Sequence, residues 1–138
     1  LVFFDAEDQG DIPGWSWIMG SKAFAQNLSK QPDYVVILDM IGDKSLNINY
    51  ERNSNPDLMM QIWSTAASLG YSDHFIPEYK YSILDDHLPF IEKGIPAVDI
   101  IDFDYKYWHT TMDTIENTSP ESLKIVGNTL YNWLTTVQ

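Results

Sequence analysis

The sequence predicts an α/β fold, a three-layer sandwich with a mostly parallel central sheet. Apolar stretches of strand length alternate along the chain with segments of helical period. Two of the stretches, YVVILDM and AVDIID, are almost continuously apolar and rich in β-branched residues, which is typical of strands covered on both faces. No linker, repeat or low-complexity tract divides the 138 residues, so we expect a single domain.

The apolar stretches predict four strands, at residues 1–5, 34–40, 46–50 and 97–103. The first of them has no polar lead-in, and we therefore expect the chain to begin inside a larger domain. Residues 11–17 contain turn residues and two tryptophans without a clear period, which indicates a loop.

Helices are predicted where apolar residues recur at spacings of three and four. Ser21 is predicted to cap a helix that ends near Leu28, and a short helical turn is expected at residues 89–93. A second long helix opens at Asn55 and ends at Gly70. The third opens at residues 119–121, and its apolar stripe consists of Leu123, Val126, Leu130, Leu134 and Val137.

Composition narrows the functional classes. The formal net charge of −12 disfavours binding to nucleic acid and to anionic lipid, and no apolar stretch is long enough to span a membrane. The chain has no cysteine, so any metal must be bound by histidine and carboxylate.

Acidic residues follow the ends of the predicted strands. Since neighbouring parallel strands end at one edge of a sheet, we expect these carboxylates to converge there. They are Asp5, Glu7 and Asp8 after the first strand, Asp39 in the second, and Asp102 and Asp104 after the last. The adjacent pair Glu7 and Asp8 has two equally weighted interpretations: surface charge at a strand end, or a metal ligand beside a group that moves protons.

The three histidines differ in their surroundings. His74 lies in a polar turn and is expected on the surface. His87 lies in DDHLPF, where Asp85 or Asp86 has a simple explanation as a helix cap. His109 lies in a polar loop after the last strand, next to Trp108. A lone histidine is more often structural than a ligand, but His109 is predicted at the same sheet edge as the acidic residues.

Four motifs occur in a fixed order: FFDAEDQG, ILDMIGD, LDDHLPFIEKGIPAVDII and YWHTTMDT. Together they resemble the zinc aminopeptidase superfamily, and more closely its glutaminyl-peptide cyclotransferase branch. The resemblance extends over nearly the whole of residues 1–138. It implies a zinc-exopeptidase-like fold, with the chain as the C-terminal part of one catalytic domain. An extracytoplasmic or secreted location is slightly favoured by the same resemblance.

The resemblance also implies roles for individual residues. Glu7 corresponds to the general acid/base, and Asp8 and His109 correspond to zinc ligands, with Asp8 one methylene shorter than the glutamate of many members. Asp39 corresponds to a ligand of a second zinc in aminopeptidases and to a hydrogen-bonding residue in cyclases. Asp85 corresponds to an aspartate near the substrate amide. The residues expected to contact substrate are Trp108, Trp15, Trp17 and His87.

The remaining zinc ligands of the family lie upstream of the motifs in this chain. With only two zinc ligands of its own, the chain is expected to bind zinc weakly, because a catalytic zinc normally has about three protein ligands. The implied reaction is cyclisation of N-terminal glutamine on peptides or proteins with one zinc. The alternatives are a two-zinc aminopeptidase and a non-catalytic domain that keeps the fold. Exposed apolar sheet edge is further expected to favour self-association.

Overall fold

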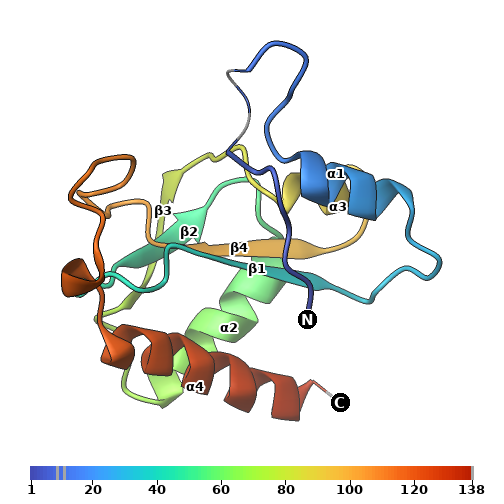
Figure 1. Cartoon of the computed structure of the whole chain (residues 1–138). Coiled ribbons are helices and arrows are strands. Elements are labelled where there is room, and N and C mark those ends of the chain that lie inside the picture. The colour runs from blue at the N-terminus through green and yellow to red at the C-terminus, as the bar shows by residue number, and fades with distance from the viewer. Residues whose placement is uncertain (9, 11, 138) are drawn as a thin grey trace.

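The computed structural model describes residues 1–8, 10 and 12–137, so Asp11 of the predicted loop lies outside the described residues. Two layers of helices cover a central layer of strands (Figure 1). Helices α1 (Met19–Gln26) and α3 (Leu88–Ile91) lie on one face, and α2 (Pro56–Ser68) and α4 (Pro120–Thr136) lie on the other. The predicted three-layer α/β fold is therefore confirmed. Among the described residues, no helix combines the length and hydrophobicity needed to cross a membrane.

The strands form two parallel pairs. Strand β1 (Val35–Asp39) pairs with β4 (Ala97–Ile101) in unbroken register, with Asp39 opposite Ile101. Strand β2 (Ile48–Glu51) pairs with β3 (Phe75–Tyr81), and the register shifts after Asn49. Strand β2 lies beside β4, which brings the two pairs into one layer. Strand β4 is buried along its whole length, as its continuous apolar sequence predicted.

Two strand predictions were wrong. Residues 1–5 form no strand; the ring of Phe4 instead packs against the rings of Phe24 and Phe90, beside β1. Strand β3 was missed because its sequence, FIPEYKY, contains a proline and two charged residues and leaves most of its side chains exposed. A proline is tolerated in a strand that lies at the edge of a sheet, where its missing N–H breaks no ladder.

The main core lies between the sheet and the pair α2 and α4. Its largest buried side chains include Trp133, Phe75 and Ile62. The predicted stripe of α4 was partly wrong: Leu123 and Leu134 are about half exposed. The inward face consists of Ser122, Ile125, Val126, Thr129 and Trp133.

The capping predictions succeeded for two of three helices. The side chain of Asn55 accepts a hydrogen bond from the amide of Leu58 at the start of α2, and Ser119 accepts one from the amide of Glu121 at the start of α4. Ser21 is not a cap, because α1 begins two residues earlier. Its hydroxyl donates to the carbonyl of Ile18 instead.

Candidate active site

The site forms at the edge of the sheet where β1 and β4 end. Because these strands are parallel and in register, Asp39 lies at the same edge as the end of β4. The loop after β4 supplies His109, and the segment before α1 supplies Glu7 and Asp8. Residues separated by about one hundred positions in the chain therefore meet at one rim.

Asp8 and His109 are in contact. The Oδ1 atom of Asp8 lies 3.5 Å from Nε2 of His109, and both side chains are at least half exposed. The ring of Trp108 stacks on the imidazole, with 4.2 Å between ring centroids. The imidazole is thus held between an indole and a carboxylate at the surface of the rim.

The backbone is strained at each segment that reaches the rim. Ala6, Met40 and His109 have φ angles of 53°, 51° and 56°, in the left-handed region that side chains other than glycine rarely occupy. Ala6 precedes Glu7, and Met40 follows Asp39. Such residues cost roughly 1–3 kcal/mol each and tend to cluster at functional sites.

Burial and neighbouring carboxyl groups raise the pKa values of Glu7 and Asp39 at the rim. The pKa of Glu7 rises to about 8, first because of burial, then because of a hydrogen bond and the charge of Asp8, with smaller effects of Asp85 and Asp39. The pKa of Asp39 rises to about 6 through burial and the charge of Asp85. Glu7 can therefore hold or release a proton near neutral pH, as a general acid/base must.

An apolar groove of about 830 Å³ leads to this cluster. Apolar side chains from residues 1–4, α1 and β1 line most of it, and its acidic lining consists of Glu7, Asp33, Asp39, Asp85 and Asp86.

The three predicted tryptophans lie away from this groove in the described structure. Trp108 covers His109, Trp15 is about half exposed, and Trp17 packs against Gly10. Their contact with substrate stays a prediction.

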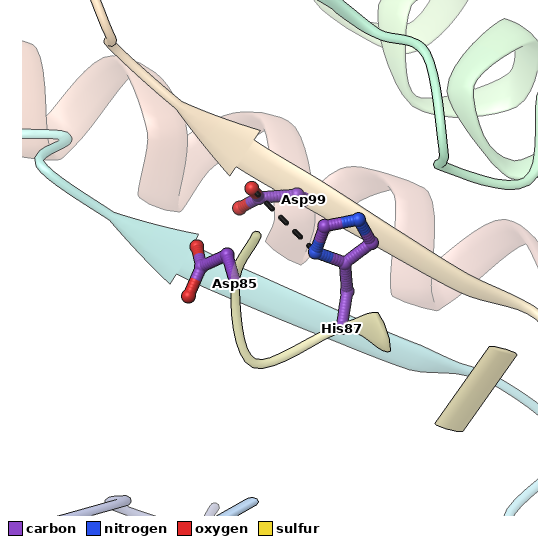
Figure 2. Close-up of side chains that lie close together, drawn as sticks. All are labelled: Asp85, His87 and Asp99. Atoms are coloured by element: carbon purple, nitrogen blue, oxygen red, sulfur yellow. Dashed lines mark ion pairs between the residues drawn. The ribbon is translucent and has the colours of Figure 1, made fainter. Parts of the chain in front are cut away.

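The prediction that His87 contacts substrate is wrong for this structure. Its side chain has no exposed surface, because it precedes α3 and points into the sheet. Its Nε2 atom lies 3.1 Å from Oε2 of Glu51, and its Nδ1 atom lies 3.7 Å from Oδ2 of Asp99 (Figure 2 shows the Asp99 contact). Sequence reasoning missed Asp99, although an aspartate inside the apolar stretch AVDII was a visible signal.

Two of the strand-end acids do not join the rim cluster. Asp102 is buried and accepts hydrogen bonds from the amides of Asn47 and Asp104. The carboxylate of Asp104 accepts from the ammonium of Lys80 and the hydroxyl of Tyr81. These two residues fasten the loop after β4 to its neighbours.

Two groups of side chains have the composition of a metal site. At the rim, the 3.5 Å between Asp8 and His109 is close to the separation of two donor atoms on one tetrahedral zinc, roughly 3.3–3.5 Å for bonds of about 2.0–2.2 Å. The rim is also open, which leaves room for further ligands. The second group, Asp85, His87 and Asp99, has donor atoms within 4.8 Å of one another and is fully buried. The rim pair fits an open catalytic zinc better, since such a site keeps a free position.

Comparisons with known proteins identify one matching family and several similar enzymes. The sequence model of peptidase family M28 matches residues 1–134. The glutaminyl-peptide cyclotransferase of Boiga irregularis is 24% identical, over 94% of this chain and 43% of its own length.

Among solved structures, the glutaminyl cyclase of Porphyromonas gingivalis superposes with a TM-score of 0.89 at 33% identity, over 99% of this chain and 55% of that one. A Zn-dependent exopeptidase from Parabacteroides distasonis has a TM-score of 0.86 at 34% identity, over 93% of this chain and 51% of that one. The chain thus spans about half the length of the proteins that it matches.

Proposed function

The chain belongs to peptidase family M28, and from that premise we propose that it is the C-terminal part of a catalytic domain that cyclises N-terminal glutamine. The product would be pyroglutamate, with release of ammonia. The observation that supports this most strongly is the contact between Asp8 and His109 beside the proton-holding Glu7. The likeness to glutaminyl cyclases favours this reaction over other reactions of the family.

Asp8 and His109 would hold the zinc, and a third ligand would come from the part of the matched domains that this chain does not span. When bound, zinc supplies Lewis acidity to the carbonyl of the substrate's side-chain amide. The charge of Asp8, which acts on Glu7, makes this position suited to a cation.

Glu7 would move the proton. In the reaction the α-amino nitrogen bonds to the side-chain carbonyl carbon, and the bond from that carbon to the amide nitrogen breaks. The carboxylate of Glu7 takes a proton from the attacking amine and gives it to the departing nitrogen, which leaves as ammonia. Asp85 and Asp39, whose charges act on Glu7, would orient it and the substrate amide. Trp108, Trp15 and Trp17 would exclude water, a competing nucleophile.

The second candidate is a two-zinc aminopeptidase on the same scaffold. It is favoured by the likeness to a Zn-dependent exopeptidase. It is also favoured because the charge of Asp8 contributes to the raised pKa of Asp39. Asp39 would then be a ligand of the second zinc, and Glu7 would activate a water molecule for hydrolysis.

The complete protein should be assayed in parallel on peptides that begin with glutamine and on aminoacyl amides. We expect ring closure, with mass loss of ammonia, and one tightly bound zinc per chain. Hydrolysis without ring closure, together with two tightly bound zinc ions, would remove the cyclase proposal and support the aminopeptidase.

The groove beside β1 would further favour self-association of this chain. Leu1 and Phe3 are almost fully exposed, and Leu38 of β1 is 43% exposed. Exposed apolar surface next to a strand edge tends to bind another chain. Light scattering of the 138-residue chain should show mass increasing with concentration, and Phe3→Ser should reduce this increase. A constant monomeric mass at high concentration would exclude it.

A further inference from the structure

We propose that Phe103 and Tyr81 are positioning residues for the imidazole of His109. Their rings continue the stack of Trp108 on this imidazole as far as β3. Tyr81 is the last residue of β3, and the other three residues lie in the loop after β4. The role of His109 as a zinc ligand rests on the proposed function, whereas the aromatic row is a feature of the structure itself.

The four rings form a continuous row. The rings of Tyr81 and Phe103 meet edge to face with 5.2 Å between centroids, and those of Phe103 and Trp108 are 5.0 Å apart and tilted by 53°. The Trp108 indole then lies nearly parallel to the imidazole of His109, with an interplanar angle of 27°. Aromatic rings about 4.5–7 Å apart attract each other in edge-to-face and offset arrangements. The orientation of each ring is therefore restricted by the next one.

The outer end of the row is fastened to the loop that carries His109. The hydroxyl of Tyr81 donates to Oδ1 of Asp104 at 2.6 Å, and Nζ of Lys80 donates to Oδ2 of the same carboxylate at 2.6 Å. The amide of Asp104 donates to the buried carboxyl of Asp102. Because exposed ion pairs contribute little to stability, we assign these contacts a geometric role. They hold the end of β3 against the loop.

The imidazole needs such support because burial does not immobilise it. Its side chain is 50% exposed, and Trp108 is 45% exposed. The second side-chain torsion of histidine has broad minima, so an exposed ring samples many orientations. Among the described residues, the polar and aromatic contacts of the ring are those with Asp8 and Trp108. The stack therefore selects the orientation in which Nε2 faces Asp8.

A zinc ion at the rim requires this orientation of the imidazole. Metal-binding histidines are commonly oriented by a hydrogen bond on the second ring nitrogen. At His109 the aromatic row takes that role, since Trp108 sets the plane of the imidazole and Phe103 braces Trp108. Phe103 and Tyr81 belong to neither hydrophobic core, so the loss of one ring should free the imidazole and leave the fold intact.

The orientation of the imidazole can be measured in the complete protein without zinc. In a chelator, proton NMR should show the ring protons of His109 shifted upfield by the stacked indole. We expect Phe103→Leu, which keeps apolar bulk, to lose this shift and Phe103→Tyr, which keeps a ring, to retain it. Tyr79→Leu is the matched control, because Tyr79 is an exposed residue of β3 whose ring contacts Tyr50 instead of the row. An unchanged shift in a folded Phe103→Leu protein would overturn the proposal.

Tyr81 offers an independent pair of variants. Tyr81→Leu removes the outermost ring and should reduce the upfield shift of the His109 protons. Tyr81→Phe keeps the ring, loses only the hydrogen bond to Asp104, and should retain most of the shift. This pair decides the question even if Phe103→Leu does not fold, since a full shift in Tyr81→Leu would overturn the proposal.

Zinc affinity connects the aromatic row to the proposed function. Competition with a chelating dye measures this affinity in the complete protein. We expect Phe103→Leu to weaken zinc binding by roughly 10–100-fold, the scale on which residues that support a metal ligand act, and Phe103→Tyr to restore it to within about 2-fold. Unchanged zinc affinity in a folded Phe103→Leu protein would overturn the proposal. If the wild-type protein binds zinc but does not cyclise glutamine, the proposed reaction fails, while the NMR and zinc results still decide the role of the row.

Discussion

At the scale of single residues, the chemistry depends on carboxyl groups that keep protons near neutral pH. Glu7 and Asp39 have raised pKa values for the same reasons, burial and neighbouring negative charge. Such crowding is costly without a cation or shared protons. It is therefore consistent with a site that binds a metal and transfers a proton.

The role of Glu7 is tested by Glu7→Gln in the complete enzyme. We expect kcat to fall by about 10² to 10⁴, because glutamine keeps the size of the side chain but cannot take a proton. Glu78→Gln, at an exposed position on β3, is the matched control and should retain full activity. An unchanged rate in Glu7→Gln, with zinc content preserved, would contradict the role of Glu7 as the general acid/base.

Sequence reasoning at this scale predicted that Asp8 and His109 meet but gave the wrong structural reason for it. The two side chains are in contact at the sheet edge, although residues 1–5, which were predicted to place Asp8 there, form no strand. The location of His87 does not follow from any local signal, because DDHLPF is compatible with a pocket wall and with a buried contact. Only the packing of α3 on β4 directs this side chain toward Asp99.

At the scale of elements, the helix caps and the strained turns fix where each segment begins and ends. The cap of α2 is clear because Asn55 accepts from the amide of Leu58, and Pro56 follows it. The amide of Asn55 also donates to the carbonyl of Ala97, which connects the start of α2 to β4. One residue thus sets the start of a core helix and its position against the sheet.

We expect Asn55→Ala to lower the free energy of unfolding by about 1 kcal/mol, since an unsatisfied helix N-terminus loses roughly 0.5–2 kcal/mol. Urea denaturation followed by circular dichroism measures this change. Ser64→Ala on the exposed face of the same helix should change stability by less than about 0.5 kcal/mol. Equal stabilities of Asn55→Ala and the wild type would show that the cap contributes nothing.

Elements with strong local signals were predicted well, and those that depend on tertiary contacts were not. The caps of α2 and α4 depend on neighbouring residues, and both were correct. The inner face of α4 was predicted wrongly, because its leucines form an apolar stripe on another face. In the structure it is the face with Thr129 and Trp133 that packs against α2 and the sheet. Leucine at an exposed helix position is common, so the pattern alone could not decide.

At the scale of the whole molecule, excess negative charge and buried carboxyls make stability depend on pH. Burial raises the pKa of Asp102, as of Asp39, to about 6, and it raises the pKa of Asp99 well above its ordinary value. These groups bind protons more tightly in the folded state than in the unfolded chain, where carboxyl pKa values are near 4. Their contribution to stability is present below about pH 4 and is lost as pH rises through about 6.

We therefore expect the zinc-free protein to have a higher Tm near pH 5 than near pH 7.5, measured by calorimetry in a chelator. Asp102→Asn should make this difference smaller, because it removes one of the titrating groups. The pKa values of Glu51 and Asp104 are lowered, so these two residues lose their contribution to stability only as pH falls below the ordinary carboxyl range. They therefore do not reverse the trend in Tm above pH 5. A Tm that increases from pH 5 to pH 7.5 would contradict the assignment of buried protons.

The central claim is that Asp8 and His109 bind one zinc ion at the rim, beside Glu7. It is tested most directly by anomalous scattering at the zinc absorption edge from crystals of the complete protein. The account predicts a single strong peak within about 2.0–2.2 Å of a carboxylate oxygen of Asp8 and of Nε2 of His109. A zinc ion bound by Asp85, His87 and Asp99, or one bound by neither Asp8 nor His109, would contradict it.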